Sequence, residues 1–279
     1  MSFYPQPDNY RCGPFALKYA LVMLGVFKHE DKIAKIAGST WWDGTDELGL
    51  AKAAAIFKCK MNYFQSDNPS DALKLLNAWL KKGIPCVLSV NNWEHWITVV
   101  KYTRKSYIYL DSENNRVIGI LTSSQLSKYW RYKDESEDKS ISYDGYAIEP
   151  KFKTYTKASF SLEKARTLMY KKNDILASKW DQYFNDLITI CKPRNKQTAK
   201  LITFPEFLRR NEATLVRKIA NWHGTPKYTE LKKILYNMKF VAEIYDLIIP
   251  LDEEKKALVD ISALLMMYAC GKYGMDPIY

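Results

Sequence analysis

The N-terminal half of the chain changes from helical to strand-like hydrophobic patterns along its length. The pattern predicts helices over residues 14–24, 30–37, 45–57 and 70–82. Short apolar runs then predict strands over residues 85–90, 97–102, 106–110, 116–120 and 143–149. Helices followed by strands indicate an α+β fold, in which the helices pack on an antiparallel sheet.

The C-terminal half has a helical pattern almost throughout. Residues 150–157 show little periodicity and are predicted to be a connector. After them the pattern predicts helices over residues 161–170, 174–191, 204–222, 228–248 and 253–270, with an extended segment at 200–205. Pro193, Pro226 and Pro250 mark the breaks between these helices. We therefore expect two domains, an α+β domain over residues 1–150 and an all-α domain over residues 151–279.

The composition is typical of a folded, soluble chain. With 279 residues, of which 47% are hydrophobic, it is long enough for one large or two modest domains. No apolar run approaches the ~20 residues of a membrane-spanning helix, and the N-terminus does not resemble a signal peptide. Five scattered cysteines suit a reducing compartment, so we expect a cytoplasmic protein. Only eleven residues precede Cys12, so we expect no inhibitory segment ahead of it.

Net charge is distributed unevenly between the two halves. Residues 1–150 contain 19 Lys+Arg and 17 Asp+Glu, whereas residues 151–279 contain 23 and 14. The C-terminal half therefore carries +9 of the net charge of +11. Such an excess suits an acidic protein partner, nucleic acid or an anionic membrane surface, but solvated helix faces explain it equally well. No nucleic-acid-binding motif is present.

The most informative segment for chemistry is Gln6-Pro-Asp-Asn-Tyr-Arg-Cys12-Gly-Pro-Phe-Ala-Leu. It places the Cys12 thiol at a predicted helix start, where the partial positive charge of the helix favours a nucleophilic thiolate. Pro14 fits the first helical turn because its φ angle is already helical. Gln6, upstream of the thiol, is placed to donate a hydrogen bond to a developing oxyanion.

A nucleophilic thiol needs a base, and the chain contains only three histidines. His29 lies in a charged turn and His223 at a predicted helix end, so both are interpreted as surface or capping residues. His95 differs, because it directly precedes the predicted strand 97–102. It is therefore the candidate base.

A strand register links His95 to Asp111, which follows the next predicted strand. If residues 103–105 form a three-residue hairpin loop, Ile97 faces Asp111 across the ladder. His95 shares the face of Ile97 because side chains alternate with a period of two. His95 and Asp111 would then be diagonal neighbours within reach of each other. A two-residue loop would reverse this parity.

These residues resemble the motifs of a known family, the C39 and C39-like cysteine peptidases, which are papain-like enzymes. The resemblance covers residues 3–149. It rests on Gln6-x5-Cys12-Gly13-Pro14, on His95-Trp96-Ile97-Thr98-Val99-Val100 and on Asp111, with weaker support from Gly44-Thr45 and Gly83-Ile-Pro85. It implies that Cys12 is the nucleophile and His95 the base. It also implies that Asp111 orients His95 and that Gln6 donates to the oxyanion.

The chain departs from the family pattern at four positions. Arg11 stands where many relatives carry an acidic residue, and its charge is expected to favour a thiolate. Phe15 replaces a small residue and is expected to narrow the cleft. Ser112 stands where relatives often have proline, and Lys58 where glycine is usual.

Trp41-Trp42-Asp43 and Trp93 are candidates for the cleft wall or, equally, for core packing.

The residues leave several functions open. The leading hypothesis is a thiol peptidase acting on a peptide or protein substrate. Alternatives are another acyl transfer at the same site, namely transpeptidation, deamidation or thioester chemistry, and a non-catalytic papain-like binding module. The other cysteines, Cys59, Cys86, Cys191 and Cys270, lack metal-binding spacing, so no metal, cofactor or disulfide framework is expected. The helical C-terminal domain is expected to serve recognition or regulation.

Overall fold

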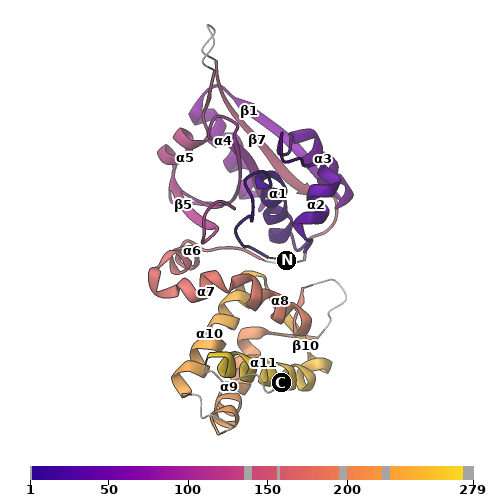
Figure 1. The fold of residues 1–279 in the computed structure, drawn as a ribbon, viewed down its shortest axis with the longest axis vertical. Helices are drawn as coiled ribbons and strands as arrows, with labels where there is room; N and C mark the ends of the chain where they lie inside the picture. The colour runs from indigo at the N-terminus through magenta and orange to yellow at the C-terminus, as the bar shows by residue number, and fades with distance from the viewer. Residues whose placement is uncertain (1, 135–139, 156–157, 195–199, 222–226, 273–279) are drawn as a thin grey trace. The chain divides into compact units, whose positions relative to one another are not determined.

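The computed structural model describes residues 2–134, 140–155, 158–194, 200–221 and 227–272 (Figure 1). The chain divides into two compact units. The first unit contains residues 1–154 and 159–181, and the second contains residues 155–158 and 182–279. The first unit thus extends past residue 150, the boundary that the hydrophobic pattern indicated, and includes the first helices of the C-terminal half.

The first unit combines helices with a large sheet, and the α+β expectation is confirmed. Its helices are α1 (Cys12–Met23), α2 (Glu30–Ala37), α3 (Glu47–Ile56), α4 (Pro69–Lys81), α5 (Ser123–Trp130), α6 (Leu162–Met169) and α7 (Asp174–Ser178). Its strands are β1 (Cys59–Ser66), β2 (Cys86–Val90), β3 (His95–Thr103), β4 (Ser106–Leu110), β5 (Ile118–Thr122), β6 (Tyr132–Lys133) and β7 (Ile141–Pro150). A short 3₁₀ turn, Lys171–Asn173, precedes α7.

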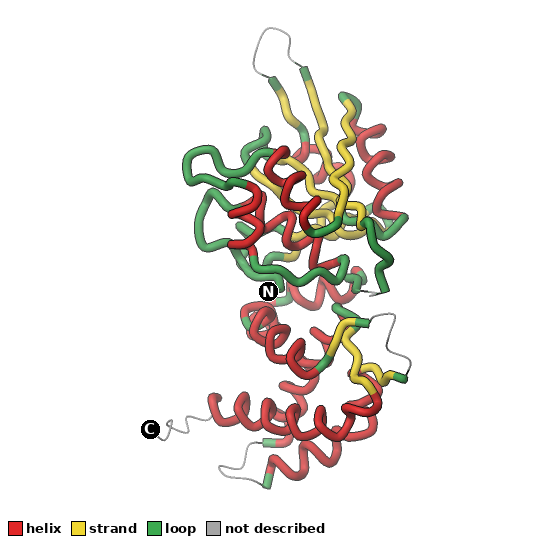
Figure 2. Tube along the Cα trace, turned by 90° about the vertical axis from the view of Figure 1, so that its right-hand side faces the viewer, coloured by secondary structure: helices red, strands yellow, loops and turns green. Residues whose placement is uncertain are grey.

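The strands form one antiparallel sheet in the order β1-β7-β2-β3-β4-β5, with β6 paired to β7. Alternating residues of β2 point to opposite faces, as the strand period requires. Val87 packs in a core with residues of α1, α2 and α3, whereas Cys86 and Leu88 pack in a second core with residues of α4 and α5. The sheet therefore lies between two helical layers (Figures 1 and 2).

Local sequence explains where these helices begin and end. The side chains of Asp46 and Asn68 accept hydrogen bonds from the first turns of α3 and α4. Thr122 and Gln125 form a capping box at the start of α5. Gly38 ends α2 at φ 73°, a left-handed conformation that glycine adopts without steric cost.

The hydrophobic pattern missed three elements of this unit: the two-residue strand β6 and the longer elements β1 and α5. Only Cys59 and Phe64 of β1 are buried, because β1 is an edge strand and most of its side chains face solvent. Helix α5 buries only Leu126 and Trp130. Both elements therefore carry too few buried apolar residues for a clear periodicity. Helix α1 also begins at Cys12 itself, two residues before its predicted start.

The second unit is helical, as expected, but it is not all-α. After α8 (Trp180–Ile190) it contains α9 (Phe204–Ala220), α10 (Tyr228–Ile244) and α11 (Glu254–Lys272), and a short 3₁₀ turn, Leu251–Glu253. Three short strands, β8 (Lys192–Pro193), β9 (Leu201–Thr203) and β10 (Leu247–Pro250), form an antiparallel sheet in the order β8-β10-β9 (Figure 2). The extended segment expected at 200–205 is β9.

The predicted helix 228–248 was too long at its end. Asp246 has a φ of 49°, which ends the helical conformation, and the branched residues Ile248 and Ile249 then pair as the central strand β10. The predicted helix 174–191 is likewise broken into α7 and α8 around Lys179. Across the described ranges, the structure contains no helix that is both long and apolar enough to cross a membrane.

Candidate active site

Helix α1 holds Cys12 at its first turn, against the sheet. Cys12 is the first residue of the helix and is buried. The hydroxyl of Thr98 in β3 donates a hydrogen bond of 2.6 Å to the carbonyl of Ala16, and this bond fastens α1 to β3. Because β3 begins at His95, this packing brings the start of the helix to the start of the strand.

The structure places His95 and Asp111 in direct contact. The His95 Nε2 atom lies 2.8 Å from Asp111 Oδ1, and both side chains are buried. The backbone N–H of Glu113 also donates to Asp111 Oδ1, at 3.0 Å. Asp111 therefore sits in a fixed position from which it orients the imidazole ring.

The register that joins these two residues arises differently from the sequence-based expectation. The hairpin loop has two residues, Arg104 and Lys105, with φ angles of 47° and 64°. A register shift between Val99 and Lys101 adds one unpaired residue to β3. The two-residue loop changes which residues face each other by one position, and the extra residue of β3 cancels that change. Thr98 therefore pairs with Leu110, and the next position places Asp111 opposite Ile97. The expected neighbourhood is present, but the loop proposed for it was wrong.

Two opposing effects set the pKa of His95. Burial by itself would lower this pKa, because it penalises the charged imidazolium. Interactions with Asp111 and with the Cys12 thiol outweigh burial and raise the pKa from 6.5 to about 10. The imidazolium form is therefore favoured at neutral pH, and it stands next to the thiol.

The other ring nitrogen of His95 is open. Its Nδ1 atom is buried and makes no hydrogen bond of normal geometry to the described residues, although the thiol is close enough to affect the ring's pKa. Glu113 Oε1 lies 3.4 Å from Nδ1 and is half exposed. Catalytic hydrogen bonds are often long in the absence of substrate. Nε2 is thus held by Asp111, and Nδ1 is the ring nitrogen without a hydrogen-bond partner among the described residues.

Two hydrogen bonds with Ser112, the residue that follows Asp111, fix the position of Gln6. Its backbone N–H donates to the Ser112 carbonyl at 2.9 Å, and the Ser112 hydroxyl donates to Gln6 Oε1 at 2.5 Å. The Gln6 Nε2 atom is buried without a hydrogen-bond partner among the described residues. A buried donor without a partner costs free energy, so this amide nitrogen is available to an acceptor that the described residues do not supply.

Two of the family departures have a different effect from the one expected. The Arg11 guanidinium pairs with Asp8 at 3.1 Å and with Asp31 at 2.6 Å, so its charge is largely neutralised before it can act on Cys12. Phe15 is fully buried against Tyr4 and does not narrow a cleft. Lys58 has a φ of 57°, which explains why glycine is usual there.

The remaining sequence candidates lie in varied surroundings. His29 caps α2 and its side chain is 54% exposed, as expected for a surface residue. His223 lies outside the described residues. Trp41 and Trp42 stack on each other and are mostly exposed. Asp43 and Trp93 line a cavity, so these two belong to a wall rather than to the core.

Metal binding finds little support in the residues that the structure describes. One group, His29, Glu30 and Asp31, has ligand atoms close together, but Glu30 is already bound by Lys18 and Tyr4. All five cysteines are free. Burial raises the pKa of Cys59 to about 11 and that of Cys191 to about 12, which keeps these thiols protonated and inert.

Sequence reasoning missed the part that Ser112 and Glu113 take in this site. Ser112 had been noted only as a departure from the family pattern, and its contact with Gln6 joins residues 106 positions apart. In the sequence, only their position directly after Asp111 indicated that Ser112 and Glu113 belong to the site.

The N-terminal region is similar in sequence to a known family. Residues 1–133 match the model of the Peptidase C39 family, and the resemblance inferred from the motifs is confirmed for that region. No curated protein sequence matches the chain.

Several solved structures are similar to the N-terminal region. The peptidase domain of Streptococcus ComA, a bi-functional ABC transporter involved in a quorum-sensing pathway, is 15% identical with a TM-score of 0.41, over 53% of this chain and 96% of that one. A double-glycine-motif protease from an AMS/PCAT transporter, solved with its leader peptide, is 15% identical with a TM-score of 0.41, over 53% and 90%. The peptidase domain of Streptococcus mutans ComA is 14% identical with a TM-score of 0.34, over 51% and 97%. At these TM-scores the likenesses carry no argument about function.

Proposed function

We propose that the C39-family peptidase region of this chain is an active cysteine peptidase that cleaves a peptide or protein substrate. The single observation that carries the proposal is the buried His95, whose Nε2 is held by Asp111 and whose Nδ1 has no hydrogen-bond partner among the described residues. Its pKa is raised to about 10 by the interactions with Asp111 and Cys12, against the effect of burial. A structural histidine would have both nitrogens satisfied.

In the proposed mechanism, the Cys12 sulfur attacks the carbonyl carbon of the scissile peptide bond. The thiol proton resides on His95 Nδ1, and Asp111 keeps the ring oriented throughout. The oxyanion of the tetrahedral intermediate accepts hydrogen bonds from Gln6 Nε2 and the Cys12 backbone N–H. His95 then passes its proton to the leaving amine, and the acyl group remains on the sulfur.

Hydrolysis of that thioester completes the reaction. His95 takes a proton from water, which attacks the acyl carbon and releases the carboxylic acid with a free Cys12 thiol. Transpeptidation or deamidation would share the acyl-enzyme and differ only in the acceptor or the leaving group. The nature of the released product therefore separates these outcomes from the peptidase.

The discriminating experiment compares Cys12→Ala with the unmodified protein in two assays. We expect iodoacetamide at neutral pH to label Cys12 far faster than the buried Cys59, Cys86 and Cys191, since only Cys12 has a base beside it. We also expect new protein termini, detected by mass spectrometry, in cell extracts treated with the unmodified protein only. Slow labelling of Cys12 with no cleavage would instead indicate a non-catalytic papain-like binding module.

We propose further that the helical C-terminal region, which carries most of the basic excess, selects the substrate or an acidic partner in the cytoplasm. The boundary expected at residue 150 lies inside the first compact unit, which extends to Asp181. A chain ending after Asp181 would contain the first compact unit without most of α8 and test this division. We expect it to remain soluble and to label at Cys12 like the full chain. Aggregation of that shorter chain would argue that the two regions share one core.

A further inference from the structure

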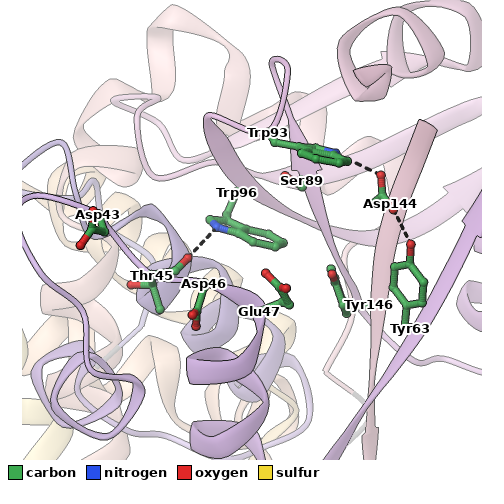
Figure 3. A pocket seen from close by; sticks show the side chains of 10 residues that line it. All are labelled: Asp43, Thr45, Asp46, Glu47, Tyr63, Ser89, Trp93, Trp96, Asp144 and Tyr146. Atoms are coloured by element: carbon green, nitrogen blue, oxygen red, sulfur yellow. Dashed lines mark hydrogen bonds between the residues drawn. The ribbon is translucent and has the colours of Figure 1, made fainter. Parts of the chain in front are cut away.

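A cavity of about 620 Å³ opens in the first unit beside the proposed active site. Four carboxylates line it: Asp43, Asp46, Glu47 and Asp144. Aromatic side chains, among them Trp93 and Trp96, form much of the remaining wall (Figure 3). An acidic cavity is unexpected in a chain whose net charge is +11.

The cavity is continuous with the nucleophile's helix. Trp96 follows His95 in β3, and its Nε1 atom donates to the Thr45 carbonyl at 3.2 Å. Both side chains pack on Gly13, the residue after Cys12. A Cβ atom at Gly13 would lie 3.0 Å from Thr45 Cβ and 3.4 Å from Trp96 Cδ1. The cavity wall therefore includes a side chain, that of Trp96, which packs against the residue next to Cys12.

The carboxylates of the cavity have no cationic partner. None of the four forms an ion pair with a lysine, arginine or histidine in the described part of the chain. Asp46 accepts from the Gly49 backbone as a helix cap. Asp144 is buried, yet it accepts only from neutral groups: Tyr63 Oη at 2.6 Å, Trp93 Nε1 at 3.0 Å and Ser142 Oγ at 2.6 Å. Asp43, Asp46 and Glu47 are exposed, so the cost of burying a charge without a counter-ion falls on Asp144, which a cation would stabilise.

The tyrosines of the cavity respond to this negative field. Burial raises the pKa of Tyr146 to about 12, and the charges of Glu47 and Asp144 add to the rise. The pKa of Tyr63 is also raised, by burial and then by its hydrogen bond to Asp144.

Ser89 adds a polar group to the wall of the cavity. Its side chain lines the cavity and is only 4% exposed, but its hydroxyl has no hydrogen-bond partner among the described residues. The hydroxyl is not among the fully buried polar atoms that lack a partner, so it faces the cavity space and is available to a group that enters there. Figure 3 shows Ser89 beside Trp93, with Glu47 and Trp96 facing the same space.

We propose that this cavity binds an arginine or lysine side chain of the peptide substrate, close to the scissile bond. The aliphatic stem of that side chain packs on Trp96 and Tyr146, whose ring faces also attract the cation. Its charged end is neutralised by Glu47 and Asp144, and Ser89 supplies a further hydrogen-bonding group. This specificity rests on the proposed peptidase function, because it names the substrate class of the same site.

The test uses three matched peptidyl acyloxymethyl ketones, which alkylate a reactive thiol and differ in one side chain: arginine, its neutral isostere citrulline, or glutamate. We expect the arginine reagent to inactivate the full-length protein at least about tenfold faster than the citrulline reagent. This ratio corresponds to the free energy of one charge-assisted hydrogen bond. Glu47→Gln should reduce that preference, and Asp71→Asn, at an exposed carboxylate outside the cavity, should leave it unchanged.

Separate measurements distinguish failure of the cavity from failure of the nucleophile. Fast iodoacetamide labelling of Cys12 combined with equal rates for arginine and citrulline reagents would overturn the cavity proposal alone. If Cys12 proves unreactive, calorimetric titration of Cys12→Ala with the short amide acetyl-Arg-Gly-Gly tests binding without chemistry. Binding that weakens with citrulline and in Glu47→Gln would support the cavity. Binding indifferent to both changes would refute it.

Discussion

Two buried charged clusters in the first unit show how a site differs from a structural ion pair. One is His95 with Asp111 and Cys12, and the other is Lys18 with Glu30 and Tyr4. Both are buried, and both join α1 to other parts of the fold. They differ in whether every polar atom has a partner.

The second cluster is complete. Lys18 Nζ lies 2.9 Å from Glu30 Oε2, and Tyr4 Oη donates to the same oxygen at 2.5 Å. The ammonium also lies 3.5 Å from the centre of the Tyr4 ring. Burial lowers the pKa of Lys18, although Glu30 opposes this effect. Such a saturated pair stabilises the position of the N-terminal segment and has no free atom for chemistry.

The His95 cluster is incomplete in a specific way. His95 Nδ1 and Gln6 Nε2 are both buried without hydrogen-bond partners among the described residues. In the proposed mechanism, His95 carries a proton and Gln6 donates to the oxyanion. A bound substrate would supply the partners that these two atoms lack. The comparison teaches that these two clusters differ in their open polar atoms rather than in burial or charge. Open atoms alone do not mark a site, since Asn77 Oδ1 is also buried without a hydrogen-bond partner.

The largest expected effect is loss of activity in Cys12→Ala. Removing the nucleophile should reduce turnover by about 10⁴-fold or more, because no other residue can take its place. His95→Ala should be nearly as damaging, and the double variant no worse than either, since the two groups act as a unit. Cleavage assays with natural substrate measure the rates, and circular dichroism checks the fold. Undiminished turnover in Cys12→Ala would end the peptidase hypothesis.

Breaking the saturated pair should affect stability instead of chemistry. Lys18→Met leaves Glu30 buried without its counter-ion and should lower the free energy of unfolding by about 3–5 kcal/mol. Lys74→Met, which breaks an exposed pair with Asp71, is the matched control and should cost less than about 1 kcal/mol. Urea denaturation measures both. Equal effects of the two substitutions would contradict the structural role of Lys18.

Removing the proposed oxyanion donor should slow the reaction while sparing the nucleophile. Gln6→Ala should reduce kcat by about 10²–10³-fold, as for other single donors. Iodoacetamide should still label Cys12 at nearly the original rate, because alkylation forms no oxyanion. If labelling and folding were lost together, Gln6 would be a structural residue.

The alkaline limit of reactivity tests how Asp111 acts. The folded-state pKa of His95 is raised to about 10, so the imidazolium contributes stability that is complete below 6.5 and lost as pH rises toward 10. Asp111→Asn removes a raising interaction and leaves the lowering effect of burial. Peptide hydrolysis needs a protonated His95 to supply the leaving amine with a proton, so its alkaline limb should move toward neutral pH by at least about one unit. An unchanged pH profile would show that Asp111 does not control His95.

The smallest effect is expected for Ser112, which acts through Gln6. Ser112→Ala frees the Gln6 amide to rotate and should reduce kcat by about tenfold, the worth of one hydrogen bond to an orienting group. Ser112→Thr keeps the hydroxyl and should restore most of the rate. KM should change little in either variant, because the loss concerns the transition state. A rate unaffected by Ser112→Ala would show that the backbone bond to Gln6 suffices.

The sequence alone determined which residues are candidates for the site and which faces they share. The helix start at Cys12 and the period of β3 depend on neighbouring residues, so local rules predict them. The hydrophobic pattern likewise revealed the two kinds of architecture, because each helix and strand must bury one face. The edge strand β1 escaped detection since it buries little.

Tertiary structure decided how the candidates meet. A register shift near Val99 restores the parity that the two-residue loop removes, and nothing in the local pattern indicates it. The contact of Ser112 with Gln6, the partner of Lys18 and the carboxylates around Glu47 all join segments distant in sequence. Such contacts depend on how packed faces fit together, and hydrophobic periodicity specifies which side of an element is buried without specifying which side chains meet there.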